Sequence, residues 1–213
     1  MNRKTTRRTI ATVVVTLLWS LGHVALGING DERREVTRLA ELTQWKVGTV
    51  VADIGAGEGT FSFVAAEKVG PSGRVYATEI DTGKLKNLKA EAAKRKLENI
   101  IIVEGTADDT KLPSNCCDTI FLRHVYHHLT RPQEFDRNLV RSLRLGAYLA
   151  IIDFPPSPNS TLVEGVPKNR GGHGIPQNVM VEELTSAGLQ VEKIIDDWSA
   201  SDYCVIFKRT NRE

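Results

Sequence analysis

Cysteine is scarce in this chain. Its 213 residues include three cysteines, and none belongs to a C-x-x-C pair of the kind found in thiolate zinc sites and thioredoxin-like redox centres. Cys116 and Cys117 are adjacent, and Cys204 lies in an apolar stretch. This usage excludes a scaffold built on disulfides, and we expect the three side chains to act as small apolar residues.

The chain also lacks an excess of either charge and is poor in aromatic residues. Its 28 basic and 26 acidic residues leave a formal net charge of +2, and aromatics make up 6%. A nearly neutral protein has no general electrostatic attraction to nucleic acid, and the chain has no basic stripe with interleaved aromatics that would bind single strands. Nucleic acid is therefore not an expected partner, and the length suits one domain with a short extension.

Acidic residues are absent before Asp31. Residues 1–9 carry four basic side chains, and an apolar run follows over residues 10–28. A basic start, an apolar middle and small residues at the end are typical of a secretory signal, and the run is just long enough to span a membrane if it is not cleaved. We therefore expect residues 1–30 to be a signal or membrane anchor and residues 31–213 to be the functional domain. Membrane association through residues 10–28, or export, is the favoured location, with a cytoplasm-facing or organellar one as the alternative.

The most informative segment reads VVADIGAGEGTFSF, residues 50–63. A β-branched run leads to Asp53, glycines alternate at Gly55, Gly57 and Gly59, and an apolar helical pattern follows. A strand, a glycine turn and a helix start in this order seat nucleotide-like cofactors. Glycine suits the turn because it adopts positive φ and lets a ligand lie against bare backbone.

The spacing of the glycines differs from the one that binds dinucleotide cofactors. The dinucleotide fingerprint G-x-G-x-x-G places its third glycine one residue later, where this chain has Thr60. Glu79 falls near the end of the next strand, at about the offset of an acid that binds ribose hydroxyls, and a carboxylate can accept from both hydroxyls of one ribose. The spacing therefore disfavours an NAD-dependent oxidoreductase, which we keep as an alternative function.

Five blocks resemble, in order and spacing, the class I S-adenosylmethionine-dependent methyltransferase family, and the resemblance covers residues 32–210. The blocks are DIGAGEG (53–59), VYATEID (75–81), GTADDTKLP (105–113), CDTIFLRHVYHHL (117–129) and RSLRLGAYLAIIDF (141–154).

This resemblance implies S-adenosylmethionine as the cofactor and a set of residues that hold it. The glycine turn would line its methionine and ribose part, Glu79 would hold the ribose, and the GTADD block would contact adenine through Asp108 and the backbone of Ala107. Many relatives have Gly-Asp-Ala where this chain has Gly-Thr-Ala, which leaves the position of the aspartate open by one or two residues. The expected cofactor-binding residues are Asp53, Gly55, Ala56, Gly57, Gly59, Glu79, Ala107 and Asp108.

Strands alternate with helices along the chain, which predicts an α/β fold with a doubly wound, mostly parallel seven-stranded sheet and helices on both faces. Two short strands close the chain and, as the resemblance also implies, form an antiparallel C-terminal hairpin. The strands are expected at 49–53, 74–79, 100–104, 118–123, 147–153, 189–196 and 203–208, and the helices at 31–44, 60–69, 84–96, 132–143 and 178–187.

The richest source of catalytic groups is the segment RHVYHHL, residues 123–129. An acceptor that loses a proton during methyl transfer benefits from a base, and histidine titrates near neutral pH. His127, His124 and Tyr126 are the catalytic candidates. For His127 a structural role, such as capping the next helix, is an equal alternative, and for His128 the structural role is the favoured interpretation.

Three histidines in one segment also raise the question of a metal site with Asp153. The ligand set is incomplete, and adjacent side chains of a strand or helix point apart, so no metal ligand is expected. His173 lies in a long loop rich in proline and glycine, either as part of a mobile lid or as a plain surface residue.

The sequence thus predicts a methyltransferase for a small or medium acceptor carrying a hydroxyl or thiol, or resembling a lipid. The place after the fourth strand reads Arg123-His124-Val125-Tyr126 instead of the Asn-Pro-Pro-Tyr-like signature of the family's DNA and amino-group methylases. The alternatives are a non-catalytic cofactor-binding module and the NAD-dependent oxidoreductase.

Overall fold

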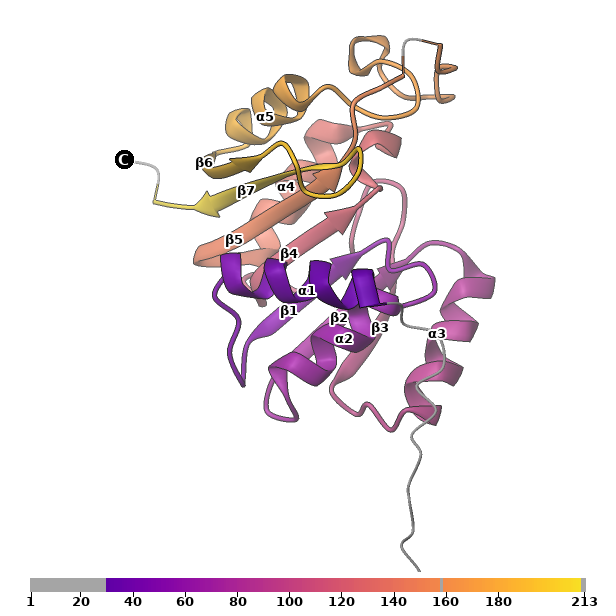
Figure 1. Ribbon diagram of the computed structural model, residues 1–213, viewed down its shortest axis with the longest axis vertical. Helices are drawn as coiled ribbons and strands as arrows, with labels where there is room; N and C mark the ends of the chain where they lie inside the picture. The colour runs from indigo at the N-terminus through magenta and orange to yellow at the C-terminus, as the bar shows by residue number, and fades with distance from the viewer. Residues whose placement is uncertain (1–29, 158, 212–213) are drawn as a thin grey trace, which may run out of the picture.

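The computed structural model describes residues 30–157 and 159–211 (Figure 1). The predicted signal or anchor at residues 1–30 lies outside this part, except for Gly30. Within the described ranges, the structure has no helix with the length and apolar character needed to cross a membrane.

A seven-stranded sheet forms the centre of the molecule, with the strand order β3-β2-β1-β4-β5-β7-β6. The first five strands in this order are parallel, and β7 runs antiparallel to both of its neighbours. The predicted fold class is confirmed. The strands are β1 (Val50–Ile54), β2 (Arg74–Glu79), β3 (Ile100–Glu104), β4 (Cys117–Arg123), β5 (Leu143–Asp153), β6 (Leu189–Ile195) and β7 (Tyr203–Arg209).

Helices cover both faces of the sheet. Helices α1 and α2 pack on one face, α4 and α5 lie on the other, and α3 packs beside α2 near the β3 edge (Figure 1). The helices are α1 (Gly30–Leu42), α2 (Thr60–Val69), α3 (Thr82–Lys94), α4 (Pro132–Ser142) and α5 (Gln177–Ser186), with two short 3-10 helices, η1 (Tyr126–His128) and η2 (Lys168–Arg170).

The central strands are apolar on both sides because both of their faces are covered. In β4, Ile120 and Leu122 belong to the core under α4 and α5, whereas Phe121 belongs to the core under α1 and α2. All three side chains are fully buried. This double packing holds the carboxyl ends of the parallel strands in place, and these ends form the rim on which a site is built.

Two elements begin two or more residues before their predicted starts, in each case for a local reason. Helix α3 begins at Thr82, two residues early, because the Asp81 carboxylate caps it by accepting a hydrogen bond from the Lys84 N–H at 2.9 Å. Strand β5 begins at Leu143 because this residue pairs with Cys117 before the register shifts.

The prediction for the cysteines is wrong for two of the three. Cys116 and Cys117 are joined by a disulfide at the start of β4. A disulfide between adjacent cysteines connects no distant segments, so it is not the disulfide scaffold that the cysteine count excludes. Cys204 is free and buried in β7, and burial raises the pKa of its thiol to about 12, which agrees with an apolar packing role.

Candidate cofactor and catalytic site

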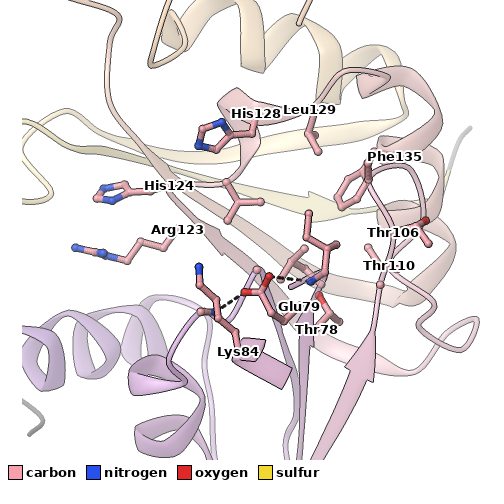
Figure 2. Close-up of a pocket in the computed structure, with 17 residues that line it drawn as sticks. Thr78, Glu79, Lys84, Thr106, Thr110, Arg123, His124, His128, Leu129 and Phe135 are labelled. Atoms are coloured by element: carbon pink, nitrogen blue, oxygen red, sulfur yellow. Dashed lines mark hydrogen bonds between the residues drawn. The ribbon is translucent and has the colours of Figure 1, made fainter. Parts of the chain in front are cut away.

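A cavity of about 340 Å³ opens at the carboxyl ends of β1, β2 and β4, where the strand order reverses (Figure 2). This switch point is where open α/β sheets bind their ligands, and the volume lies in the range of small-molecule pockets. The lining residues are Ile54, Gly55, Gly57, Thr78, Glu79, Ile80, Lys84, Gly105, Thr106, Ala107, Thr110, Arg123, His124, Val125, His128, Leu129 and Phe135.

The glycine turn forms one wall of this cavity. Gly55 and Gly57 have φ values of 71° and 57°, which glycine adopts without strain. A Cβ atom at Gly55 would lie 2.5 Å from Val125, so this glycine lets the chain after β4 pack against the turn. A Cβ atom at Gly57 would meet nothing within 4 Å, so bare backbone faces open space where a ligand can lie.

The Glu79 carboxylate is buried at the cavity wall and held in one orientation by three backbone N–H groups. Its Oε2 accepts from Gly57 at 2.9 Å, and its Oε1 accepts from Ile80 at 2.8 Å and Asp81 at 3.1 Å. The bond from Gly57 joins the end of β2 to the glycine turn (Figure 2). A fixed carboxylate beside bare backbone fits the sugar hydroxyls of a nucleoside.

The segment after β3 forms another wall of the cavity, and it differs from the prediction at Asp108. Ala107 lines the cavity as expected, together with Thr106, whereas Asp108 does not. Asp108 pairs with Arg131 and accepts a hydrogen bond from the Thr106 hydroxyl at 2.7 Å. The Thr106 hydrogen bond, followed by the Arg131 charge, lowers the pKa of the Asp108 carboxyl. Thr106 stands where the resemblance to the family leads us to expect an aspartate. This departure from the family pattern was the signal in the sequence that the position of the aspartate could differ.

Asp53, Ala56 and Gly59 also lie behind the cavity wall instead of lining it. The Asp53 carboxylate is buried and accepts a hydrogen bond from the Ser62 hydroxyl at 2.6 Å, which ties the end of β1 to α2. Burial raises the pKa of Asp53 to about 7, although the Ser62 bond opposes the shift. Ala56 donates its N–H to Thr78 O at 2.8 Å.

Gly59 precedes α2 with φ 84°, and a Cβ atom there would lie 2.6 Å from Phe63. Asp53, Ala56 and Gly59 therefore shape the glycine turn from behind.

His124 lines the cavity directly after β4, and a carboxylate that the sequence did not reveal holds its ring. His124 Nε2 lies 2.8 Å from Asp202 Oδ2, and Asp202 is buried between β6 and β7 and also accepts from the Ser199 hydroxyl at 2.9 Å. The backbone of His124 has φ 56°, an uncommon conformation for a residue other than glycine. With Nε2–H donated to Asp202, the lone pair of Nδ1 is available as a proton acceptor.

The structure removes Tyr126 from the catalytic candidates. Its ring is fully buried, and its hydroxyl oxygen lies 3.0 Å from a carboxylate oxygen of Asp136 on α4 and 3.0 Å from one of Glu183 on α5. Burial, followed by the Asp136 charge, raises the pKa of Tyr126 well above its usual value. The phenol therefore stays protonated and faces the core.

His127 lies just outside the cavity, and His128 lines it. The two rings are 3.9 Å apart between centroids, and the His173 ring lies 4.8 Å from that of His127. The expectation that neighbouring histidines point apart is wrong here because both lie in the tight turn η1, which is neither strand nor regular helix. One ring nitrogen of each histidine lies within 4.8 Å of the other two, so these three side chains could hold a metal ion.

Residues 52–151, which include most of β1, the glycine turn, β2 to β4 and most of β5, match the family model described as a methyltransferase domain. The chain thus carries a methyltransferase domain, as predicted for the class I S-adenosylmethionine-dependent family. This match removes the NAD-dependent oxidoreductase from the alternatives and confirms the predicted family and its cofactor, S-adenosylmethionine.

Individual relatives of this methyltransferase chain share part of its length. The chain is 35% identical over 83 residues to aklanonic acid methyltransferase DauC of Streptomyces sp. (strain C5), covering 39% of this chain and 38% of that protein. It is 26% identical over 121 residues to demethylmenaquinone methyltransferase of Listeria monocytogenes serotype 4a (strain HCC23), covering 57% and 50%. The matches thus span half or less of the length of these relatives.

A crystal structure of a SAM-dependent methyltransferase from Aquifex aeolicus has the same fold. The two structures superpose with a TM-score of 0.68 at 24% identity, covering 83% of this chain and 92% of that one.

Proposed function

We propose that this protein transfers a methyl group from S-adenosylmethionine to a hydroxyl group of a small-molecule acceptor. The observation that carries the proposal is that one cavity is lined by the cofactor turn and Glu79 on one side and by the His124 imidazole on the other. The names of the aklanonic acid and demethylmenaquinone enzymes support a small-molecule acceptor.

The cofactor, when bound, supplies an electrophilic methyl group, and the residues of the chain hold the reactants and move a proton. The backbone at Gly57 and the carboxylate of Glu79 would bind the nucleoside end, and Leu129 and Phe135 give the cavity apolar walls that exclude water. The residues of the cavity would hold the acceptor oxygen in line with the methyl group that the bound cofactor supplies, so positioning would account for much of the acceleration. His124 Nδ1 takes the hydroxyl proton, and Asp202 orients the imidazole through Nε2.

Calorimetry tests the cofactor part of this proposal. The purified chain should bind S-adenosylmethionine and S-adenosylhomocysteine, and Glu79→Gln should weaken both by about 10- to 100-fold because a charge-assisted acceptor is lost. Glu104→Gln is the matched control, since Glu104 is the exposed register partner of Glu79 on β3. Absence of heat with both ligands contradicts the proposal, whereas binding without turnover across a screen of hydroxylated acceptors would assign a non-catalytic binding module.

Removal of the His124 imidazole should lower turnover and spare cofactor binding. With an acceptor from the screen, we expect His124→Ala to reduce the rate of S-adenosylhomocysteine formation by about 100- to 10,000-fold, and Asp202→Asn to reduce it by a smaller factor. Asp197→Asn, in the same loop with a fully exposed side chain, is the control and should match the wild type. Equal rates for His124→Ala and the wild type would exclude His124 as the base.

We also propose that residues 1–30 direct the chain to a membrane or out of the cytoplasm. The support is the sequence pattern alone: basic residues 1–9 followed by the apolar run 10–28. Mass spectrometry of the protein from its native host, after fractionation, tests the proposal. A start near Ile28 indicates cleavage, and an intact Met1 in the membrane fraction indicates an anchor. An intact Met1 in the cytosol contradicts both.

A further inference from the structure

A buried histidine nitrogen lacks a partner beside the candidate cavity. Among the described residues, the buried side-chain nitrogen and oxygen atoms without a hydrogen-bond partner are His127 Nε2 and Arg170 Nε. The His127 side chain is 1% exposed. A buried polar atom without a partner is destabilising and rare, and it calls for a ligand or an ion that completes it.

The other nitrogen of the same ring is held in the way that metal ligands are held. His127 Nδ1 lies 2.8 Å from Asp153 Oδ1, and Asp153 Oδ2 accepts the His127 backbone N–H at 3.2 Å. Asp153 is fully buried, and its Oδ1 also accepts the Phe154 N–H at 3.0 Å. A carboxylate on one ring nitrogen fixes the tautomer and leaves the lone pair of Nε2 for a metal ion.

Two further imidazoles approach His127. His128 follows it in η1, and His173 comes from the long loop between β5 and α5. Their rings stand 3.9 Å and 4.8 Å from that of His127. One ring nitrogen of each of the three lies within 4.8 Å of the others.

We propose that His127, His128 and His173 form a binding site for a divalent transition metal ion, with Zn²⁺ as the ion that fits best. Three imidazoles are a common ligand set for zinc, and such a set leaves a fourth coordination position open. Nitrogens around tetrahedral zinc lie about 3.3 Å apart, given bonds of about 2.0 Å. The site closes by rotation of the exposed His128 and His173 rings toward the fixed His127.

The site borders the cofactor cavity, because His128 also lines that cavity (Figure 2). An ion held there would have its open position near the place proposed for the acceptor. Metal binding itself does not depend on the proposed methyl transfer, so it is measured without cofactor or acceptor.

Zinc titration of the full chain tests the proposal. The protein is purified through a tag without histidine, stripped with a chelator and titrated with ZnCl₂ in competition with a chromogenic chelator. We expect one equivalent of Zn²⁺ to bind, and His128→Ala and His173→Ala each to weaken binding by at least tenfold. Both side chains are exposed, so both variants should fold, which circular dichroism checks. Absence of stoichiometric binding, or unchanged affinity in both variants, overturns the proposal.

Two controls locate the ion. His124→Ala removes a nearby imidazole that is bonded to Asp202 and lies outside the cluster, so it should keep the wild-type zinc affinity. The double variant Cys116→Ser, Cys117→Ser should keep it as well. Loss of binding in the cysteine variant would place the ion on Cys116 and Cys117 with their disulfide reduced, and would overturn the assignment. With Co²⁺ in place of Zn²⁺, the wild type should show a visible absorption band that His173→Ala lacks.

Discussion

Replacement of Arg170 by alanine should lower the free energy of unfolding by about 3–5 kcal/mol, the usual cost of breaking a buried charged network. Arg170 is fully buried. Its guanidinium donates to Leu129 O at 2.7 Å and to Tyr126 O at 2.8 Å, and it lies 3.4 Å from the Glu183 carboxylate. The alanine variant removes one buried donor from two carbonyls and from one carboxylate, which is why the expected loss is large.

Urea unfolding followed by circular dichroism measures this loss. Arg144→Ala is the matched control, because Arg144 pairs with Asp118 at the surface with its side chain 45% exposed, and exposed pairs contribute about 0–1 kcal/mol. Arg170→Lys should give an intermediate loss, since lysine keeps the charge but cannot donate to both carbonyls in the same planar geometry. If the loss at Arg170 is as small as that at Arg144, the stability of the loop between β5 and α5 does not depend on the Arg170 side chain.

Gly57→Val should abolish detectable binding of S-adenosylmethionine, a loss of at least about 100-fold, while the fold is retained. A side chain at Gly57 would extend into the cavity, since a Cβ atom there meets no protein atom within 4 Å. The positive φ of 57° adds a strain of about 1–2 kcal/mol for a residue with a Cβ atom. Calorimetric titration measures the affinity, and thermal unfolding measures the strain.

Gly146→Val separates the two effects. Gly146 also has positive φ, 79°, and open space around its Cβ position, but it lies at the exposed start of β5, away from the cavity. We expect this variant to show similar strain and unchanged affinity for the cofactor. If both variants bind equally well, the glycine turn does not contact the cofactor.

The local elements were predictable because their signals are local. β2, β3 and α2 have the residue ranges that the sequence predicted, since each is a run of apolar residues bounded by glycine, proline or polar residues. The same holds for the cavity wall formed by Gly55, Gly57 and Glu79. Their order along the chain is the order in which a strand, a turn and the next strand bring them together.

The hydrogen-bond and ion-pair partners of the candidate site residues were not predictable in this way. Asp202 binds His124 across 78 positions of sequence, and nothing in the segment around Asp202 marks it as a partner. Asp108 was expected in the cavity, but its pairing with Arg131 of the distant segment before α4 keeps it outside. Tyr126 was a catalytic candidate by its neighbours in sequence, yet the packing of α4 and α5 encloses it.

The amino-acid sequence by itself determined the alternation of strands and helices, the glycine turn and the acid on the second strand, because hydrophobic period and backbone freedom are properties of short segments. Only the tertiary structure decided which polar side chains lie close together in space. His127, His128 and His173 meet because the loop after β5 folds back over η1, and long-range contacts of this kind depend on how the layers pack, which no short segment specifies.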